Sequence, residues 1–345
     1  MKRDPPTRRA SFLPLAAAMA LAMALAMASP LWALEKIKLA YSSPGGAAII
    51  SAAISEGYFA DEGFEVEPLS LTAPEISQKI ASGEIKGGEI NHLGLKLASH
   101  GAPLIFTAGL YGGFVEILAG PSWGPGHKPI LAVQDLASGP AVAAARYFRS
   151  EGIDPDADIG WLETDDPLAA LESSEASALA RWEFKRHEAA HGHDHGHAPA
   201  DEPTVLFGAS ASLPAHSPAD DGGNPHAKHT SAHHLFESFV VLPATLAESD
   251  PASAAAITRA LIRGARRVGE NPSKAADLAT GLWGGPREPL EAEIARYMWM
   301  PGVSHAKEHL RYYIHEGIKR GALAPNLDEK AFFGRVFSQA LPDLN

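Results

Sequence analysis

The sequence contains no cysteine, so thiolate metal ligands, iron–sulfur clusters, cysteine nucleophiles and disulfides are excluded. Any bound metal must therefore be held by His, Asp or Glu. Positive charge is also scarce, because 29 lysines and arginines stand against 41 aspartates and glutamates, which gives a net charge of −12. This balance argues against nucleic acid as a partner and suits a protein that collects cations.

Catalytic signatures are missing as well. The chain has no Gly-x-Ser-x-Gly turn, no His-Glu-x-x-His helix and no phosphate-binding loop. We therefore expect a binding protein that is not an enzyme and carries no organic cofactor. The length of 345 residues predicts two domains.

The N-terminus has the features of an export signal. Arg8 and Arg9 precede an uncharged apolar run over residues 13–28, and Ala-Met-Ala at 26–28 offers a cleavage site. The run is shorter than the ~20 residues that a membrane-spanning helix needs. We predict a cleaved signal peptide over residues 1–33, with the choice between Sec and twin-arginine export left open.

After the leader, strand-like and helix-like segments alternate. Strands are predicted at 37–41, 64–67, 104–108, 114–119, 129–133, 204–208 and up to 241, and helices at 47–56, 74–82, 141–151, 252–268, 273–280, 290–298 and 305–317. This alternation predicts an α/β fold with parallel-rich sheets and helices on both faces. Ligands of such sheets bind beyond the carboxyl ends of the strands.

Ten of the sixteen histidines lie between His187 and His234, and the densest run is His191-Gly-His-Asp-His-Gly-His197. Two segments there, 187–203 and 214–234, lack hydrophobic periodicity and read as inserted loops. Neutral imidazole is a common ligand of transition metals, so the tracts predict metal binding. The alternative is a solvated loop that picks up metal incidentally. The metal candidates in these loops are His191, His193, His195, His197, His229, His233 and His234.

Several short motifs carry a resemblance to a known family. They are Glu56-Gly-Tyr-Phe59 with Glu62-Gly63, Ile80-Ala-Ser-Gly-Glu-Ile85, Lys96-Leu-Ala-Ser-His-Gly-Ala-Pro103 and Val268-Gly-Glu-Asn-Pro272. In these motifs the chain resembles the periplasmic substrate-binding proteins of ABC importers, in the group of sulfonate, taurine and nitrate binders and thiamine-precursor proteins. The resemblance covers nearly the whole chain after the leader.

The resemblance implies a two-lobed type II periplasmic binding protein with two crossover strands, at 114–119 and 236–241. Lobe 1 would comprise 34–120 plus 241–345, and lobe 2 would comprise 121–240 with both His-rich insertions. It also implies a monomer in the periplasm whose lobes close on a ligand and then dock on an inner-membrane ABC permease. The ligand-binding residues that it implies are Tyr41, Ser43, Asn91, His92, Tyr111, Gly139, Trp182 and Glu183.

Two departures from the family point to the cargo. Lys86-Gly-Gly-Glu-Ile-Asn-His92 stands where the family has Asp-Val-Gly, and both His-rich insertions follow Trp182, at the mouth of the expected cleft. We interpret the cargo as a divalent transition metal, zinc first and nickel, cobalt or copper behind, with His92 as a ligand inside the cleft. The alternatives are a small organic anion or heterocycle with metal-buffering loops, and a periplasmic metallochaperone.

Three further residues are ambiguous on sequence alone. Glu116 lies inside an apolar predicted strand, so it needs a partner and is either a ligand or half of an ion pair. His305 and His309 share one helical face at metal-ligand spacing, on a helix that we expect to face solvent.

Overall fold

The computed structural model describes residues 33–124, 128–183, 204–207 and 234–341, and every structural statement below concerns those residues. The strands are β1 (Glu35–Tyr41), β2 (Phe64–Ser70), β3 (Gly88–Asn91), β4 (Leu104–Ala119), β5 (Ile130–Val133), β6 (Gly160–Glu163), β7 (Ala178–Glu183), β8 (Thr204–Phe207) and β9 (His234–Pro243). The helices are α2 (Pro44–Ser55), α3 (Tyr58–Asp61), α4 (Ala73–Ala81), α5 (Leu93–Ser99), α6 (Gly139–Ser150), α7 (Pro167–Glu172), α8 (Ala244–Ser249), α9 (Pro251–Glu270), α10 (Pro272–Trp283), α11 (Arg287–Arg296), α12 (Ser304–Lys319) and α13 (Glu329–Val336).

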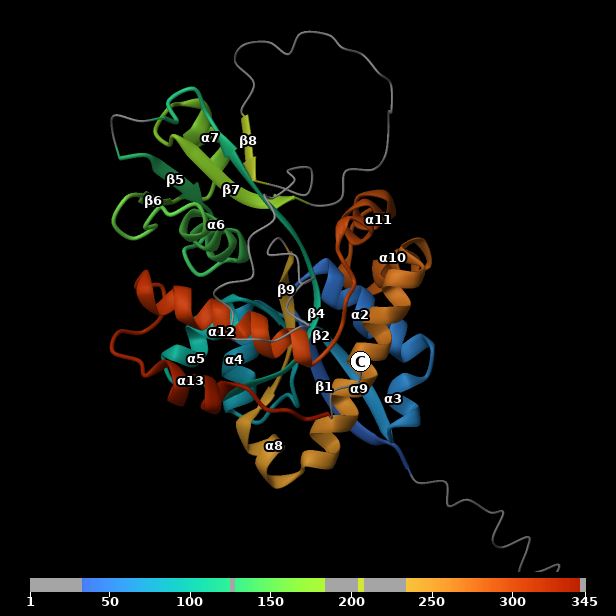
Figure 1. Cartoon of the computed structure of the whole chain (residues 1–345). Helices are drawn as coiled ribbons and strands as arrows, with labels where there is room; N and C mark the ends of the chain where they lie inside the picture. Colours follow the sequence, from blue (N-terminus) through green and yellow to red (C-terminus); the bar gives the residue numbers. More distant parts are fainter. Residues whose placement is uncertain (1–32, 125–127, 184–203, 208–233, 342–345) are drawn as a thin grey trace, which may run out of the picture.

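Two long strands organise the sheet. The strand order is β2-β1-β3-β9-β4-β7-β5-β6, with β8 paired to β4 off this path. β1 pairs in parallel with β2 and β3, and β5 pairs in parallel with β6 and β7. The antiparallel pairs of the described strands all include β4 or β9. These two strands therefore connect a first strand group (β1, β2, β3) with a second strand group (β5, β6, β7), as Figure 1 shows.

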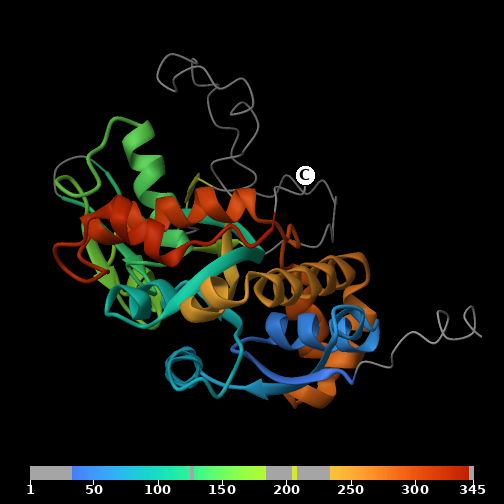
Figure 2. The same cartoon turned by 90° about the horizontal axis from the view of Figure 1, so that it is seen from below.

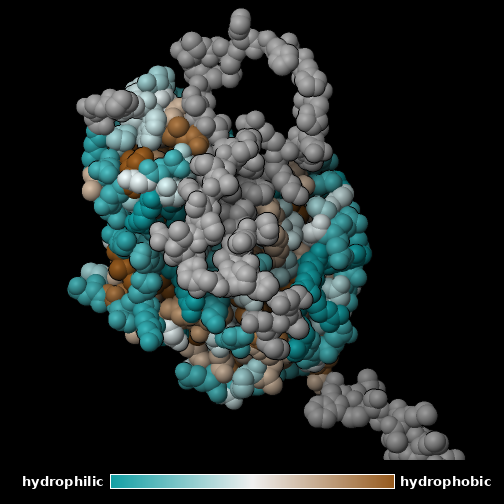
Figure 3. All heavy atoms as spheres, in the orientation of Figure 1, coloured by the Kyte–Doolittle hydropathy of each residue, from teal (hydrophilic) through white to brown (hydrophobic). Residues whose placement is uncertain are grey.

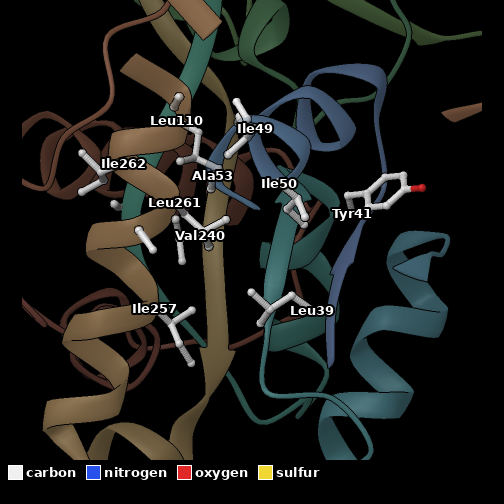
Figure 4. Close-up of a cluster of buried hydrophobic side chains, with 14 of the residues drawn as sticks. Leu39, Tyr41, Ile49, Ile50, Ala53, Leu110, Val240, Ile257, Leu261 and Ile262 are labelled. Atoms are coloured by element: carbon white, nitrogen blue, oxygen red, sulfur yellow. The ribbon is translucent and has the colours of Figure 1, made fainter. Parts of the chain in front are cut away.

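The core of the first strand group is built on the packing of α2 against α9. Helix α2 begins at Ser43, whose side chain accepts a hydrogen bond from the Gly46 N–H, and Pro44 suits its first turn. Buried side chains of α2 and α9 meet over the sheet, with Ile49 and Leu261 among them (Figure 4). Gly264 allows the close approach, since a Cβ there would lie 2.6 Å from the Ile49 carbonyl oxygen.

A second core cluster joins the two strand groups through α12. It contains Val142 and Phe148 of α6, Leu310 and Ile314 of α12, and Phe239 of β9. Helix α12 contacts α6 and both long strands, and Figures 1 and 2 show it beside α6. Helix α12 therefore packs against α6 and against the two long strands that connect the strand groups.

The observed elements confirm the predicted alternation and correct one part of it. β4 is a single strand over Leu104–Ala119, whereas the sequence predicted two strands separated near Gly109–Gly113. The small residues in this stretch mark a close approach of β9 and not a break, because a Cβ on Gly112 would lie 1.8 Å from the Leu235 carbonyl oxygen. The short elements β3, β6, β7, α3, α5, α7, α8 and α13 were not predicted.

Other expectations concern the leader and the lobes. No helix of the described residues is long and apolar enough to cross a membrane. The predicted signal peptide lies almost wholly outside the described residues, and the lobe boundaries near residues 120 and 241 stay a prediction. On the face in Figure 3, most of the described surface is hydrophilic, so a site on that face is sought in a hollow rather than in an apolar patch.

Candidate functional site

A pocket of about 460 Å³ lies between the two strand groups. Its walls come from the carboxyl end of β3 with the start of α5, from β9, and from the loops and helices that follow β5 and β6, together with β7. This is where parallel α/β sheets bind ligands, and the volume suits a small molecule. The lining residues are Asn91, His92, Leu93, Gln134, Asp135, Ser138, Pro140, Asp165, Asp166, Pro167, Leu168, Leu179, Ala180, Arg181, Trp182 and Glu237.

A second hollow, of about 540 Å³, lies beside Trp123, Lys128 and Ile159. It is larger, but all its lining residues lie between 123 and 159, and none of them carries a buried polar atom without a partner. We therefore take the pocket between the strand groups as the candidate site.

His92 is the first of two lining residues that have a buried polar atom without a partner among the described residues. It follows β3 directly and caps the start of α5. Both of its ring nitrogens are buried and have no hydrogen-bond partner among the described residues. Burial lowers the pKa of the His92 imidazole, and the carboxylate of Asp135 opposes this shift only in part. His92 is therefore a neutral imidazole with a lone pair for a metal or a hydrogen-bond donor.

Glu237 is the second of these residues. Its Oε2 atom is buried without a partner among the described residues. Burial raises the pKa of Glu237 to about 7, and the nearby carboxylates of Glu89 and Glu293 raise it further in the same direction. The side chain is therefore poised to exchange a proton for another cation near neutral pH.

A bulge in β9 explains the placement of Glu237. Tyr111 of β4 lies opposite Ser238 and Gly112 lies opposite Phe236, so Glu237 faces no residue of β4. On the other side of β9, Asn91 of β3 lies opposite Ser238. His92 and Glu237 therefore occupy the next step beyond the last pair of the β3–β9 ladder, and both line the pocket. We call these two residues the pocket pair.

Next to the pocket pair lies the buried carboxylate of Glu89, whose oxygens already accept hydrogen bonds. Glu89 is 0% exposed and accepts hydrogen bonds from the Ser42 N–H at 2.9 Å and the Ser238 hydroxyl at 2.6 Å. The hydroxyls of Ser42 and Tyr111 approach the same carboxylate at 3.2 and 3.4 Å. We call Ser42, Glu89, Tyr111 and Ser238 the Glu89 network.

The charges around the pocket favour a cation. Carboxylates from three aspartates and Glu237 line it, and the one guanidinium among the lining residues is that of Arg181. Arg181 Nε donates to Glu116 at 2.5 Å, so its charge is already compensated. Glu116 is thus half of a structural ion pair, one of the two roles that the sequence left open. The three aspartates are Asp135, Asp165 and Asp166.

Three of the predicted ligand-binding residues line the pocket, namely Asn91, His92 and Trp182. Four others lie away from its wall, and each has a physical reason. Tyr41 is 2% exposed and donates to the Leu282 carbonyl at 2.7 Å, so it belongs to the core. Ser43 bonds the Tyr111 hydroxyl at 2.6 Å, which places both beside the Glu89 network. Gly139 is covered, since a Cβ there would lie 2.3 Å from the Trp182 ring.

The predicted loop ligands fall outside the described residues. These are His191, His193, His195, His197, His229 and His233, together with the side chains of Glu183 and His234. Within the described residues, no group of three or more His, Asp or Glu side chains is arranged to hold a metal. The expectation that α12 faces solvent is wrong at His309, which is 7% exposed and accepts a hydrogen bond from the Phe236 N–H, whereas His305 is exposed.

Sequence reasoning missed Glu237 and the three aspartates. A signal for Glu237 was available, because a carboxylate inside the apolar run 235–242 is the same feature that drew attention to Glu116. The aspartates follow β5 and β6 directly, and β6 itself was not predicted.

No family model and no curated protein matches the chain. Similar solved structures include the periplasmic aliphatic sulphonate-binding protein SsuA of Escherichia coli, with a TM-score of 0.55 and 14% identity over 88% of this chain and 92% of that one. A zinc-bound ligand-binding component of an ABC-type import system from Staphylococcus aureus has a TM-score of 0.54 and 12% identity, over 88% and 96%. The periplasmic nitrate-binding protein NrtA of Synechocystis has a TM-score of 0.53 and 14% identity, over 89% and 86%.

These likenesses define the fold. The chain has the two-lobed architecture of periplasmic binding proteins, and its structural neighbours include sulphonate and nitrate binders, the group that the sequence motifs resemble. The predicted fold class is confirmed.

Proposed function

We propose that the chain is the solute-binding component of an ABC importer and that its pocket captures a cation, with a divalent transition metal, zinc first, as the cargo. The observation that carries the proposal is the pocket pair: both ring nitrogens of the neutral His92 imidazole and the Oε2 atom of Glu237 are buried and have no partner among the described residues. Buried polar groups are normally hydrogen-bonded, so two unpaired ones facing the same pocket call for a ligand.

The chemistry of the pair suits zinc. Imidazole nitrogen and carboxylate oxygen are ordinary zinc ligands, and nickel, cobalt and copper accept the same donors. The carboxylates of Asp135, Asp165 and Asp166 add negative potential around the site. The S. aureus protein of the same fold was crystallised with zinc, which supports a metal cargo for this architecture.

A second candidate is an organic cation, such as a protonated nitrogen heterocycle. The pocket volume of about 460 Å³ exceeds what a bare ion needs, and Trp182 lines the wall with an aromatic ring. The same carboxylates weigh against the anionic solutes named for the sulphonate and nitrate neighbours, because an anion would meet them at close range.

Delivery follows the usual order for such a component. The exported chain would capture its cargo in the periplasm as a monomer and present the loaded, closed form to a permease in the inner membrane. A metallochaperone that works without a permease is the alternative for this step. Cargo-stimulated ATPase activity of a reconstituted permease separates the two, since a chaperone would give no stimulation.

The binding step is tested with zinc in competition against a chromogenic chelator. We expect the wild-type chain to bind one zinc ion more tightly than any other zinc ion that it binds. We expect the double variant His92→Ala/Glu237→Gln to lose that ion. A variant lacking residues 187–203 serves as the matched control, and we expect it to keep the tight ion while losing weaker ones. Identical titration curves for the wild type and the double variant would contradict the proposal.

The organic alternative is tested in the presence of the chelator. An organic cation would be favoured by two results together. A heterocyclic amine raises the melting temperature in the presence of the chelator, and zinc does not raise it when the chelator is omitted. A rise with alkanesulfonate or nitrate would contradict a cationic cargo of either kind.

A further inference from the structure

Two side chains of helix α12 form hydrogen bonds with the backbone of β9 beside the pocket. At the bulge in β9, the N–H and the carbonyl of Phe236 both form hydrogen bonds with side chains of α12. His309 Nδ1 accepts from the Phe236 N–H at 3.2 Å, and the Tyr313 hydroxyl donates to the Phe236 carbonyl at 2.6 Å. That carbonyl belongs to the peptide unit that carries the N–H of Glu237. A side chain that holds it also orients the residue that follows.

Tyr313 also lies beside the other member of the pocket pair. Its ring lies parallel to the His92 imidazole, with 6.4 Å between the ring centroids and 7° between the planes. Tyr313 is 1% exposed and is not among the pocket-lining residues, so it lies behind the pair. Among the described residues no hydrogen bond fixes the His92 ring, so the parallel ring of Tyr313 is what limits its rotation.

The same residue meets α6, the helix that follows β5. A Cβ on Gly139, at the start of α6, would lie 2.7 Å from the Tyr313 hydroxyl. One to two turns further along α12, Arg149 of α6 pairs with the buried Glu316, and Arg320 donates to the Ala141 carbonyl at 2.7 Å. Tyr313 is therefore the point of α12 where β9, the β3–α5 junction and α6 come together.

We propose that Tyr313 is the positioning residue of this pocket, whose ring sets the orientation of His92 and whose hydroxyl sets the peptide that carries Glu237. Tyr313 holds the side chains of His92 and Glu237 in place before the cargo arrives. The conformational entropy of these two side chains is therefore lost during folding and not during binding. The inference rests on the proposed function for the identity of the cargo, and its structural part is independent of that identity.

Two substitutions separate the two contacts. Tyr313→Phe keeps the ring and removes the hydroxyl, so we expect it to weaken zinc binding at the pocket about five- to twentyfold, the range for loss of one buried hydrogen bond. In a Glu237→Gln background the same substitution should have little further effect, because the group that it positions is already altered. Tyr313→Leu also removes the stacking, and we expect the ¹⁵N resonances of the His92 ring to shift and broaden even without metal.

Tyr312→Phe is the matched control. Tyr312 is the next residue of α12 and donates to Glu308 within the same helix, away from the pocket. We expect this variant to bind zinc like the wild type and to leave the His92 resonances unchanged. The His92 signals are assigned by their absence from His92→Gln.

The outcomes are distinguishable. Two results would overturn the positioning role. One is that Tyr313→Phe leaves the zinc affinity unchanged. The other is that it reduces the affinity by the same factor in the wild-type and the Glu237→Gln backgrounds. If zinc leaves the His92 resonances of the wild type unchanged, the proposed cargo fails, while the metal-free spectrum of Tyr313→Leu still decides the role of Tyr313. Should Tyr313→Phe and Tyr313→Leu both fail to fold, 3-fluorotyrosine placed at position 313 alone gives the answer. Its ¹⁹F signal must move with the same half-saturation as the His92 signals, and a signal that stays still overturns the inference.

Discussion

Glu89 and Glu237 lie on the paired strands β3 and β9, yet the protein treats their carboxylates in opposite ways. Glu89 is completely buried and receives backbone and hydroxyl hydrogen bonds, whereas Glu237 lines the pocket and has a buried oxygen that no described residue bonds. The first arrangement is what a buried charge needs for structural stability. The second is costly unless something binds there. The difference identifies Glu237 as available for cargo and Glu89 as part of the scaffold.

The largest effect is expected from removing the scaffold carboxylate. Glu89→Ala leaves the Ser42 N–H and the Ser238 hydroxyl without their acceptor, and we expect it to lower the free energy of unfolding by roughly 2–4 kcal/mol. Urea denaturation followed by circular dichroism measures the change. A loss below the error of the method would remove the distinction between the two glutamates.

Glu237→Gln should have the opposite sign. Its raised pKa means that native Glu237 keeps a proton up to about pH 7, whereas in the unfolded chain the proton leaves near the ordinary value of 4.5. The native state thus binds more protons between these pH values, and its stability falls as the pH rises from about 4.5 to 7. Glutamine removes this penalty, so we expect a gain of roughly 1–3 kcal/mol at pH 8 and little change at pH 4.5, with chelator present. Equal stability of both proteins at pH 8 would argue against a buried, unpaired carboxylate.

The pH dependence of zinc affinity sharpens the same contrast. Zinc has to displace the proton of Glu237, so affinity should rise as the pH increases towards 7, by at most about tenfold per unit, and level off above it. In Glu237→Gln this component of the dependence should disappear. Competition titrations at pH 5.5, 6.5, 7.5 and 8.5 measure it, and identical profiles for the two proteins would count against Glu237 as a ligand.

The smallest effect is expected at Tyr41. Because its hydroxyl bonds the Leu282 carbonyl inside the core, Tyr41→Phe should cost about 1 kcal/mol of stability and leave zinc affinity unchanged. A loss of zinc affinity without a loss of stability would instead indicate that Tyr41 contacts the cargo, as the family resemblance implied.

The sequence predicted the parts of the molecule that depend on local pattern. Periodicity found the long helices α2, α6, α9 and α12, and the departure from the family motif at residues 86–92 led to Asn91 and His92, both of which line the pocket. Strand-end positions were less informative. The resemblance placed Tyr41, Ser43 and Tyr111 near strand ends, but which way each side chain points depends on packing between elements distant in the chain.

Glu237 illustrates what local pattern misses. Its place in the pocket depends on a bulge where β9 passes β4, a pairing between segments more than a hundred residues apart. Tyr313 was missed for a related reason. Its periodicity indicated a helical residue, but its contacts with Phe236, His92 and Gly139 exist only once α12 packs against β9 and α6.

Anomalous diffraction at the zinc absorption edge, from crystals of the zinc-loaded full chain, tests most directly whether the pocket pair binds the cargo. We expect a peak in the pocket, about 2.0–2.2 Å from a ring nitrogen of His92 and from a carboxylate oxygen of Glu237. Peaks confined to other parts of the molecule, with an organic molecule in the pocket, would contradict this expectation.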